Sequence, residues 1–201
     1  MGPHQEAALE LGGLVGARTF VESGTYKGKT TRWAASQFDT VYTIERAKPF
    51  YDRYAGELQA LGNIHTRFGD SRECLPEIVR ELGDSPAIFW LDGHWSGGMT
   101  AGEEDECPLL DELRAIKHRR NDIIMIDDAR LFLAAPPVGF DADQWPGIFD
   151  IAMAMGDDVS RYATQIFHDI IFLGPRSPEV LACLRKWARA HAKALGREDT
   201  G

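Results

Sequence analysis

Residues 18–31, with the sequence RTFVESGTYKGKTT, decide the fold of this chain. Phe20, Val21 and their neighbours form an apolar run that is typical of a buried parallel strand. Gly24 and Gly28 then permit a tight turn and a close approach of the backbone to a ligand. A strand, a glycine turn and the start of a helix, in this order, are the layout of a nucleotide-binding site.

The details of this turn do not favour a phosphate ligand. The glycine spacing is Gly24-x-x-x-Gly28, which differs from the dinucleotide fingerprint G-x-G-x-x-G. Glu22, at the end of the strand, would repel a phosphate and suits a ligand group with a positive charge. An ordinary strand, turn and helix with a satisfied carboxylate is the alternative interpretation.

The rest of the chain repeats strands and amphipathic helices. Apolar runs that predict strands follow at 40–44, 64–68, 87–91 and 123–126, and helical patterns lie between them at 29–37, 47–61, from Ser71 to residue 82, and 109–116. This alternation predicts an α/β fold, a doubly wound, Rossmann-like and mostly parallel sheet in a single domain over residues 1–201. Runs at 162–167 and 170–173 predict an antiparallel edge hairpin. Further helices are expected at 4–11, ended by Gly12-Gly13, at 148–155 and at 178–195.

Acidic residues follow the predicted parallel strands at their ends: Glu22, Glu45, Asp70, Asp92 and Asp127. Ligands of open parallel sheets bind beyond the carboxyl ends of the strands, so we expect these side chains to meet at one site. Glu45 falls where doubly wound sites place an acid for the ribose hydroxyls. Asp70 either closes a turn or accepts an adenine amine, and Ser71 is the predicted N-cap of the next helix.

Composition limits the partners of the chain. The 201 residues are 44% apolar and carry a net charge of -9, which disfavours binding to nucleic acid or to anionic membranes. Cys74, Cys107 and Cys183 are widely spaced, so we expect neither disulfides nor a zinc site but a reducing, cytoplasmic setting. No apolar run is long enough to span a membrane. The sequence leaves open whether the chain acts as a monomer or as a homodimer.

Taken together, these motifs resemble those of class I S-adenosylmethionine-dependent methyltransferases over roughly residues 15–135. VESGTYKGKTT resembles the glycine-rich first motif, TIE the ribose-binding motif and FGDS the adenine-side motif. The resemblance implies S-adenosylmethionine as cofactor and a small-molecule acceptor. The cofactor-binding residues that it implies are Glu22, Gly24, Tyr26, Gly28, Thr30, Glu45, Asp70, Ser71 and Asp92.

Within this class, LDGHW followed by MIDDA resembles the catechol O-methyltransferase type. The resemblance implies a magnesium ion held by Asp92, Asp127 and Asp128. A divalent cation with oxygen ligands would lower the pKa of an acceptor hydroxyl and fix its oxygen in place. The alternative is that one or two of these acids cap helices or bind the substrate directly.

One departure concerns the general base. The catechol enzymes have a lysine after their His-Trp pair, whereas this chain has Ser96 after His94-Trp95 and an additional Gly93. His94 is the expected replacement, with Asp92 beside it as the second catalytic residue, because an imidazole suits proton abstraction near neutral pH. Packing on Trp95 or ligation of a metal are the other roles open to His94.

The expected function is methyl transfer to a hydroxyl of a small molecule, assisted by a divalent metal or by His94. An NAD(P)-dependent oxidoreductase could use the same sheet, but the missing fingerprint and Glu22 count against it. A non-catalytic module that binds an adenosyl group is the third possibility. The acidic residues 103–106 would contact a cationic substrate or remain solvated.

Overall fold

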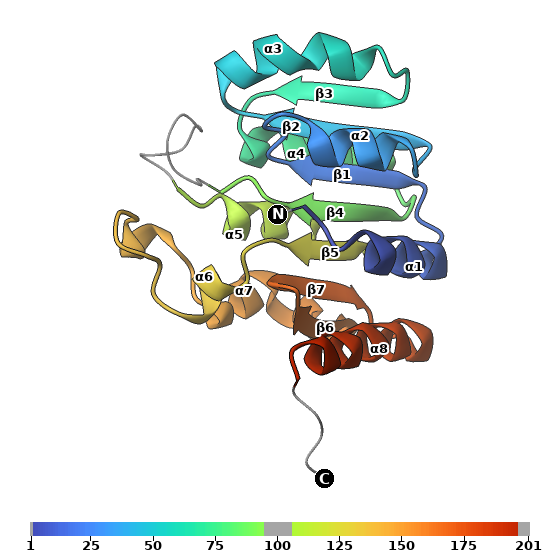
Figure 1. Cartoon of the computed structure of the whole chain (residues 1–201), viewed down its shortest axis with the longest axis vertical. Coiled ribbons are helices and arrows are strands. Elements are labelled where there is room, and N and C mark those ends of the chain that lie inside the picture. The colour runs from blue at the N-terminus through green and yellow to red at the C-terminus, as the bar shows by residue number, and fades with distance from the viewer. Residues whose placement is uncertain (1, 95–105, 197–201) are drawn as a thin grey trace.

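A computed structural model describes residues 2–94 and 106–196. Within these residues, one sheet has seven strands in the order β3-β2-β1-β4-β5-β7-β6. The strands are β1 (Thr19–Ser23), β2 (Thr40–Glu45), β3 (Ile64–Phe68), β4 (Ala87–Leu91), β5 (Ile123–Ile126), β6 (Tyr162–Phe167) and β7 (Ile170–Pro175). β1 to β5 are parallel, and β7 runs antiparallel to both β5 and β6. The predicted α/β fold with an antiparallel edge hairpin is therefore confirmed (Figure 1).

Helices cover both faces of the sheet (Figure 1). One face packs against α1 (Gln5–Val15), α2 (Lys29–Ala35), α3 (Lys48–Gln59) and α8 (Pro178–Ala194). The other face packs against α4 (Ser71–Leu82), α5 (Leu109–Ile116) and α7 (Ile148–Met155). Short helices α6 (Arg130–Leu133), η1 (Ala142–Gln144) and η2 (Gly156–Arg161) lie in the connections near the edge hairpin.

The central strands are apolar throughout because both of their faces are covered. In β4, Phe89 points into the core beside α4 and α5, whereas Trp90 points into the core beside α1 and α8. In β1, Val21 belongs to the core on the same face as Phe89, and Phe20 to the core on the same face as Trp90. All four side chains have no exposed surface. Continuous burial of this kind requires an unbroken apolar run rather than the alternation of a half-exposed strand.

Two predicted helix ends are wrong. α1 continues through Gly12-Gly13 to Val15 and ends at Gly16, which has a left-handed φ of 73°. Gly12 lies inside the helix and faces the sheet. A Cβ at this position would come within 2.8 Å of the Ile88 Cδ1 atom, so a glycine here permits the close packing of α1 on the sheet.

The second error is the N-cap of α4. The cap is Asp70, whose side chain accepts the Arg72 backbone N–H, and Ser71 is the first residue of the helix. Asp and Ser are both common N-cap residues, so the sequence alone does not distinguish Asp70 from Ser71 as the cap.

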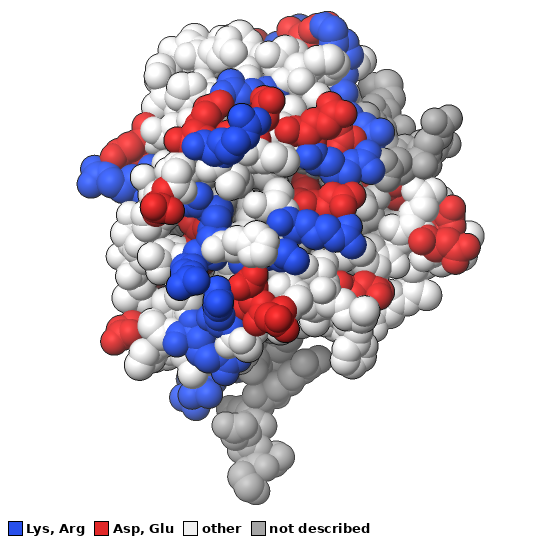
Figure 2. Space-filling view, turned by 180° about the vertical axis from the view of Figure 1, so that it is seen from behind, with Lys and Arg blue, Asp and Glu red and all other residues white. Residues whose placement is uncertain are grey.

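The surface carries charges of both signs. Figure 2 shows Lys and Arg side chains next to Asp and Glu on one face of the molecule. Several of these bases are ion-paired, among them Arg67 with Glu81 and Arg114 with Asp111. Among the helices in the described part of the chain, none is long and apolar enough to cross a membrane.

Candidate functional site

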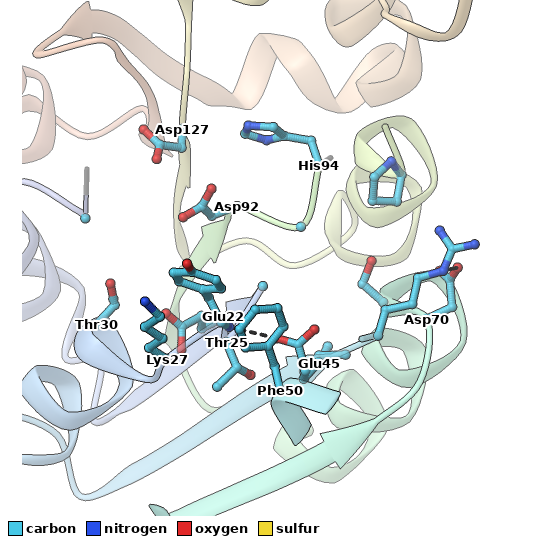
Figure 3. Close-up of a pocket in the computed structure, with 18 of the residues that line it drawn as sticks. Glu22, Thr25, Lys27, Thr30, Glu45, Phe50, Asp70, Asp92, His94 and Asp127 are labelled. Carbon is cyan, nitrogen blue, oxygen red and sulfur yellow. Dashed lines mark hydrogen bonds and ion pairs between the residues drawn. The ribbon is translucent and has the colours of Figure 1, made fainter. Parts of the chain in front are cut away.

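A cavity of about 580 Å³ opens at the carboxyl edge of β1 to β5. Six acidic residues from the ends of these five strands line it, as the sequence predicts (Figure 3): Glu22, Glu45, Asp70, Asp92, Asp127 and Asp128. Gly24, Tyr26, Thr30, Ser71 and His94 line the same cavity. The parallel strands thus bring together residues that are up to 106 positions apart in the sequence, from Glu22 to Asp128.

Gly28 is the predicted site residue that does not line this cavity. Its φ of 68° starts α2 in the left-handed region, and a Cβ at this position would come within 2.9 Å of the Leu58 Cδ2 atom. Gly28 therefore permits the turn and the packing of α2 on α3, which corrects its expected role in contacting the ligand.

Gly24 is required by the shape of the cavity wall. Its φ is 88°, and a Cβ at this position would lie 2.2 Å from the Asp92 carbonyl oxygen. Its backbone N–H donates to the Ile44 carbonyl at 3.0 Å. The turn after β1 is thus pressed against the ends of β2 and β4, and no larger residue fits there.

Glu22 lies at the bottom of the cavity with 1% of its surface exposed. Its Oε2 atom accepts hydrogen bonds from the hydroxyls of Thr31 at 2.6 Å and Thr43 at 2.8 Å. Burial outweighs these two bonds, and with the charges of Asp92 and Glu45 it raises the Glu22 pKa to about 8. A cation bound nearby would restore the charged form.

Glu45 fixes the turn that carries Tyr26. Its Oε2 atom accepts the Tyr26 backbone N–H at 2.7 Å, and its Oε1 atom accepts the Ala47 N–H at 2.7 Å. Tyr26 has a left-handed φ of 48°. The Arg46 backbone N–H is a third partner of this carboxylate, which has about four acceptor sites, so one site remains for a ligand hydroxyl. Burial raises the Glu45 pKa despite the backbone bonds.

Asp70 is engaged by arginine. The Arg72 guanidinium donates to its Oδ1 atom at 2.9 Å and to its Oδ2 atom at 2.7 Å, and Arg46 Nε lies 3.5 Å from Oδ2. The Arg72 hydrogen bond outweighs burial and lowers the Asp70 pKa. Asp70 is thus a helix cap and an ion-pair partner, and its two arginines place positive charge at this end of the cavity.

Asp92 and Asp127 lie together above Glu22 (Figure 3). Burial, followed by the charge of Asp127, raises the Asp92 pKa to about 7. Burial also raises the Asp127 pKa to about 6, although Asp127 Oδ1 accepts the Asp128 backbone N–H at 2.9 Å. Two carboxyl groups with raised pKa values in one cavity are a feature of functional sites.

His94 and Asp128 form a pair. The His94 Nε2 atom lies 3.0 Å from Asp128 Oδ2, and the His94 side chain is 5% exposed. The Trp145 ring lies edge-on to the imidazole at 5.3 Å. Burial lowers the His94 pKa, but Asp128 and the other acids outweigh burial and the net shift is upward. Burial raises the Asp128 pKa, yet His94 and Arg130 bring it down to about 2.

This pairing bears on the predicted magnesium site. Asp128 Oδ2 faces His94, and its Oδ1 atom accepts a hydrogen bond from Arg130 at 2.7 Å. Among residues 2–94 and 106–196, no group of three or more His, Cys, Asp or Glu side chains is arranged to hold a metal ion. The donor set of Asp92, Asp127 and Asp128 therefore does not fit a metal in this geometry, and the magnesium site stays a prediction.

Part of the predicted acidic loop is also accounted for. Glu106 is 3% exposed and accepts hydrogen bonds from the Trp145 indole and from the Asp141 backbone N–H. It holds the connection before α7 in place, so it is neither solvated nor free to bind a cationic substrate. Trp95, Ser96 and residues 103–105 lie outside the described residues.

The sequence reasoning missed several residues that line the cavity. Thr25 and Lys27 belong to the glycine turn and Lys29 begins α2, while Arg46 follows Glu45 and Phe50 lies in the first turn of α3. Their position in or just after the turns that follow β1 and β2 was the available signal, because these turns form the edge where ligands bind. Pro108, at the N-cap of α5, also lines the cavity and had no such signal.

Comparisons with known proteins agree with this architecture. A Klebsiella pneumoniae protein with a proposed O-methyltransferase assignment has 16% identity and a TM-score of 0.58, with 87% of this chain and 81% of that chain covered. The O-methyltransferase TomG of Streptomyces achromogenes, solved with S-adenosylmethionine, has 18% identity and a TM-score of 0.56, with 86% and 80% covered.

An O-methyltransferase of Bacillus cereus, solved with S-adenosylhomocysteine, has 16% identity and a TM-score of 0.53, with 87% of this chain and 82% of that chain covered. No protein-family model and no curated protein matches the sequence. At these identities the likeness concerns the fold. The chain therefore has the fold of the class I S-adenosylmethionine-dependent O-methyltransferases, and the resemblance seen in its motifs is confirmed at that level.

Proposed function

We propose that this chain is an S-adenosylmethionine-dependent methyltransferase that acts on a hydroxyl group of a small molecule, with His94 as the general base. The observation that carries this proposal is the His94–Asp128 pair in the wall of the cavity, with Nε2 and Oδ2 3.0 Å apart. A histidine that is oriented by a carboxylate is the usual arrangement for proton abstraction.

The chain itself can hold and move the proton. With Nε2–H donating to Asp128, Nδ1 is the ring nitrogen left to accept a proton from the acceptor hydroxyl. Asp128 then stabilises the imidazolium that forms, and its low pKa keeps it charged for this task. Trp145 packs against the ring and fixes its plane.

The cavity suits the cofactor by its charge. S-adenosylmethionine supplies an electrophilic methyl group on a positively charged sulfur, next to a second positive charge on its amino group. Burial raises the pKa values of Glu22, Asp92 and Asp127, and the charges of neighbouring acids raise them further. A ligand with positive charges would relieve their mutual repulsion. Glu45 retains acceptor capacity for ribose hydroxyls.

Two experiments test this function. The first is a calorimetric titration with S-adenosylmethionine, S-adenosylhomocysteine and NAD, which separates the methyltransferase from the oxidoreductase. Failure of both adenosyl ligands to bind would end the methyltransferase assignment. Binding without turnover of any hydroxyl acceptor in a panel would indicate the non-catalytic adenosyl-binding module.

The second experiment measures methyl transfer to a trial catechol in the wild type and in His94→Gln. We expect kcat to fall about 10²- to 10⁴-fold in the variant, the usual contribution of a general base. The affinity for S-adenosylhomocysteine should be retained. His118→Gln is the matched control, because His118 is 75% exposed and outside the cavity. Full activity of His94→Gln, with loss of activity in EDTA, would favour the metal-assisted reaction instead.

A further inference from the structure

The turn between β6 and β7 has an unusual backbone. Phe167 pairs with Ile170, so the loop contains two residues, His168 and Asp169. Their φ angles are 51° and 60°. Positive φ at both central residues is the mark of a type I′ hairpin turn, in which Gly, Asn and Asp are the favoured residues. Asp169 therefore suits this turn, and its side-chain contacts decide whether it has a further role.

The strand register brings this turn to the candidate site. Ile126 of β5 pairs with Ile171 of β7. Two steps further along this antiparallel register, Asp128 lies opposite Asp169. The Ala129 backbone N–H donates to the Asp169 carbonyl at 2.8 Å, which shows that the contact between the two segments continues past the end of β5.

Arg130 bridges the two opposed carboxylates. Its NH1 atom donates to Asp128 Oδ1 at 2.7 Å and also to Asp169 Oδ2. The Arg130 backbone N–H donates to Asp169 Oδ1 at 2.9 Å. Asp169 thus holds both the backbone and the side chain of Arg130, while Arg130 holds the oxygen of Asp128 that does not face His94.

Asp128 needs such support because its own backbone is strained. Its φ is 55°, and non-glycine residues with positive φ in the described chain are Tyr26, Asp128, His168 and Asp169. A left-handed residue of this kind is unfavourable in itself and persists where its surroundings hold it in place. Of these four, Tyr26 and Asp128 line the cavity, and His168 and Asp169 form the hairpin turn that contacts the Asp128 segment.

We propose that Asp169 is a positioning residue for the candidate base: through Arg130 it fixes the Asp128 carboxylate that orients His94. This inference rests on the proposed function of His94. The Arg130 side chain is 60% exposed and that of Asp169 30%, so the ion pair itself contributes little to the stability of the fold. Its effect falls on the orientation of Asp128 and hence on the rate.

The test compares two glycine variants of the same turn. Asp169→Gly keeps the left-handed turn, which glycine favours, and removes the carboxylate. His168→Gly makes the same change one residue earlier, where the side chain contacts the rings of His4 and His191 and not Arg130. Asp169→Asn keeps an acceptor for the Arg130 N–H but removes the charge, so it should recover part of the loss.

We expect Asp169→Gly to lower kcat about tenfold, because a misplaced catalytic group costs rate even when it is intact. The KM for the acceptor and the affinity for S-adenosylhomocysteine should not change. His168→Gly should retain the wild-type kcat. A rise in KM or a fall in cofactor affinity of about the same factor as the fall in kcat would indicate a general structural effect and overturn the proposal.

A second measurement does not depend on turnover. The side-chain nitrogen-15 signals of His94 at fixed pH report its hydrogen bond with Asp128. They should change in Asp169→Gly and stay as in the wild type in His168→Gly. Unchanged His94 signals in Asp169→Gly would refute the link even if no methyl acceptor is found, whereas a changed signal without turnover would leave the link standing and reject only the proposed function. Arg130→Gln, which leaves the turn intact, gives the same comparison if Asp169→Gly does not fold.

Discussion

The replacement Glu22→Gln tests whether the acid at the bottom of the cavity holds a proton. Glu22 has a pKa of about 8 in the folded chain against 4.5 for an exposed glutamate, mainly because it is buried. The folded state therefore binds a proton that the unfolded state has released. The contribution of Glu22 to the free energy of unfolding is largest below pH 4.5 and falls as the pH rises towards about 8.

The magnitude follows from the size of the shift. Each pH unit within this window costs about 1.4 kcal/mol, so Glu22 should lower the stability of the wild type by about 2–3 kcal/mol between about pH 5.5 and pH 7.5. A glutamine cannot lose a proton, and its carbonyl oxygen can still accept the bonds from Thr31 and Thr43. Relative to the wild type, Glu22→Gln should become progressively more stable over this range.

Urea denaturation at several pH values measures this difference. Asp92 and Asp127 also titrate in the window and are present in both proteins, so most of their effect is shared and the difference mainly reports Glu22. Glu57→Gln is the control, because it makes the same replacement at a side chain that is 62% exposed. A difference between Glu22→Gln and the wild type that stays constant from pH 5.5 to pH 7.5 would show that Glu22 is charged in the folded state, and the argument from burial would fail.

Three further outcomes are expected. Gly24→Ala should abolish cofactor binding in a calorimetric titration, because its Cβ would lie 2.2 Å from the Asp92 carbonyl oxygen; retained affinity would contradict this. Glu45→Gln should weaken cofactor binding about tenfold through the loss of a charged acceptor, with the thermal midpoint as the control for folding. Gly13→Ala should stabilise the chain by about 0.5–1 kcal/mol in urea denaturation, because Gly13 is helical with nothing within 4 Å of its Cβ, whereas Gly12→Ala, which meets Ile88 at 2.8 Å, should not.

The sequence alone predicts the position of a residue where that position depends only on the strand to which the residue belongs. Apolar runs such as 87–91 can only be buried on both faces, and the acid after each run then falls at the ligand edge of the sheet. The five acids predicted in this way, Glu22, Glu45, Asp70, Asp92 and Asp127, all line one cavity. The same logic failed at Gly12, since a glycine that permits packing and a glycine that ends a helix look alike in a sequence.

The hydrogen-bond and ion-pair partners of these acids could not be predicted from the sequence, for a different reason. Asp128 was expected to bind a metal, yet it pairs with His94 and Arg130, and Arg130 is held by Asp169. That link depends on the register of an antiparallel strand that is separated from β5 by more than forty residues. No local pattern encodes such a pairing, because a shift of the register by one residue would leave the composition of both strands unchanged.

The six acids of the cavity differ in how their charge is balanced, and this difference shows where a cationic ligand is needed. Asp70 is balanced by arginine, and Asp128 by His94 and Arg130. Glu45 accepts the backbone N–H groups of Tyr26, Arg46 and Ala47. Glu22, Asp92 and Asp127 keep raised pKa values of about 8, 7 and 6, because burial outweighs the groups that favour their charged forms. Of these, Glu22 and Asp92 have the larger share of the protonated form at neutral pH. A positive ligand would gain most from contact with Glu22 and Asp92, because it would favour their carboxylate forms and release protons as it binds.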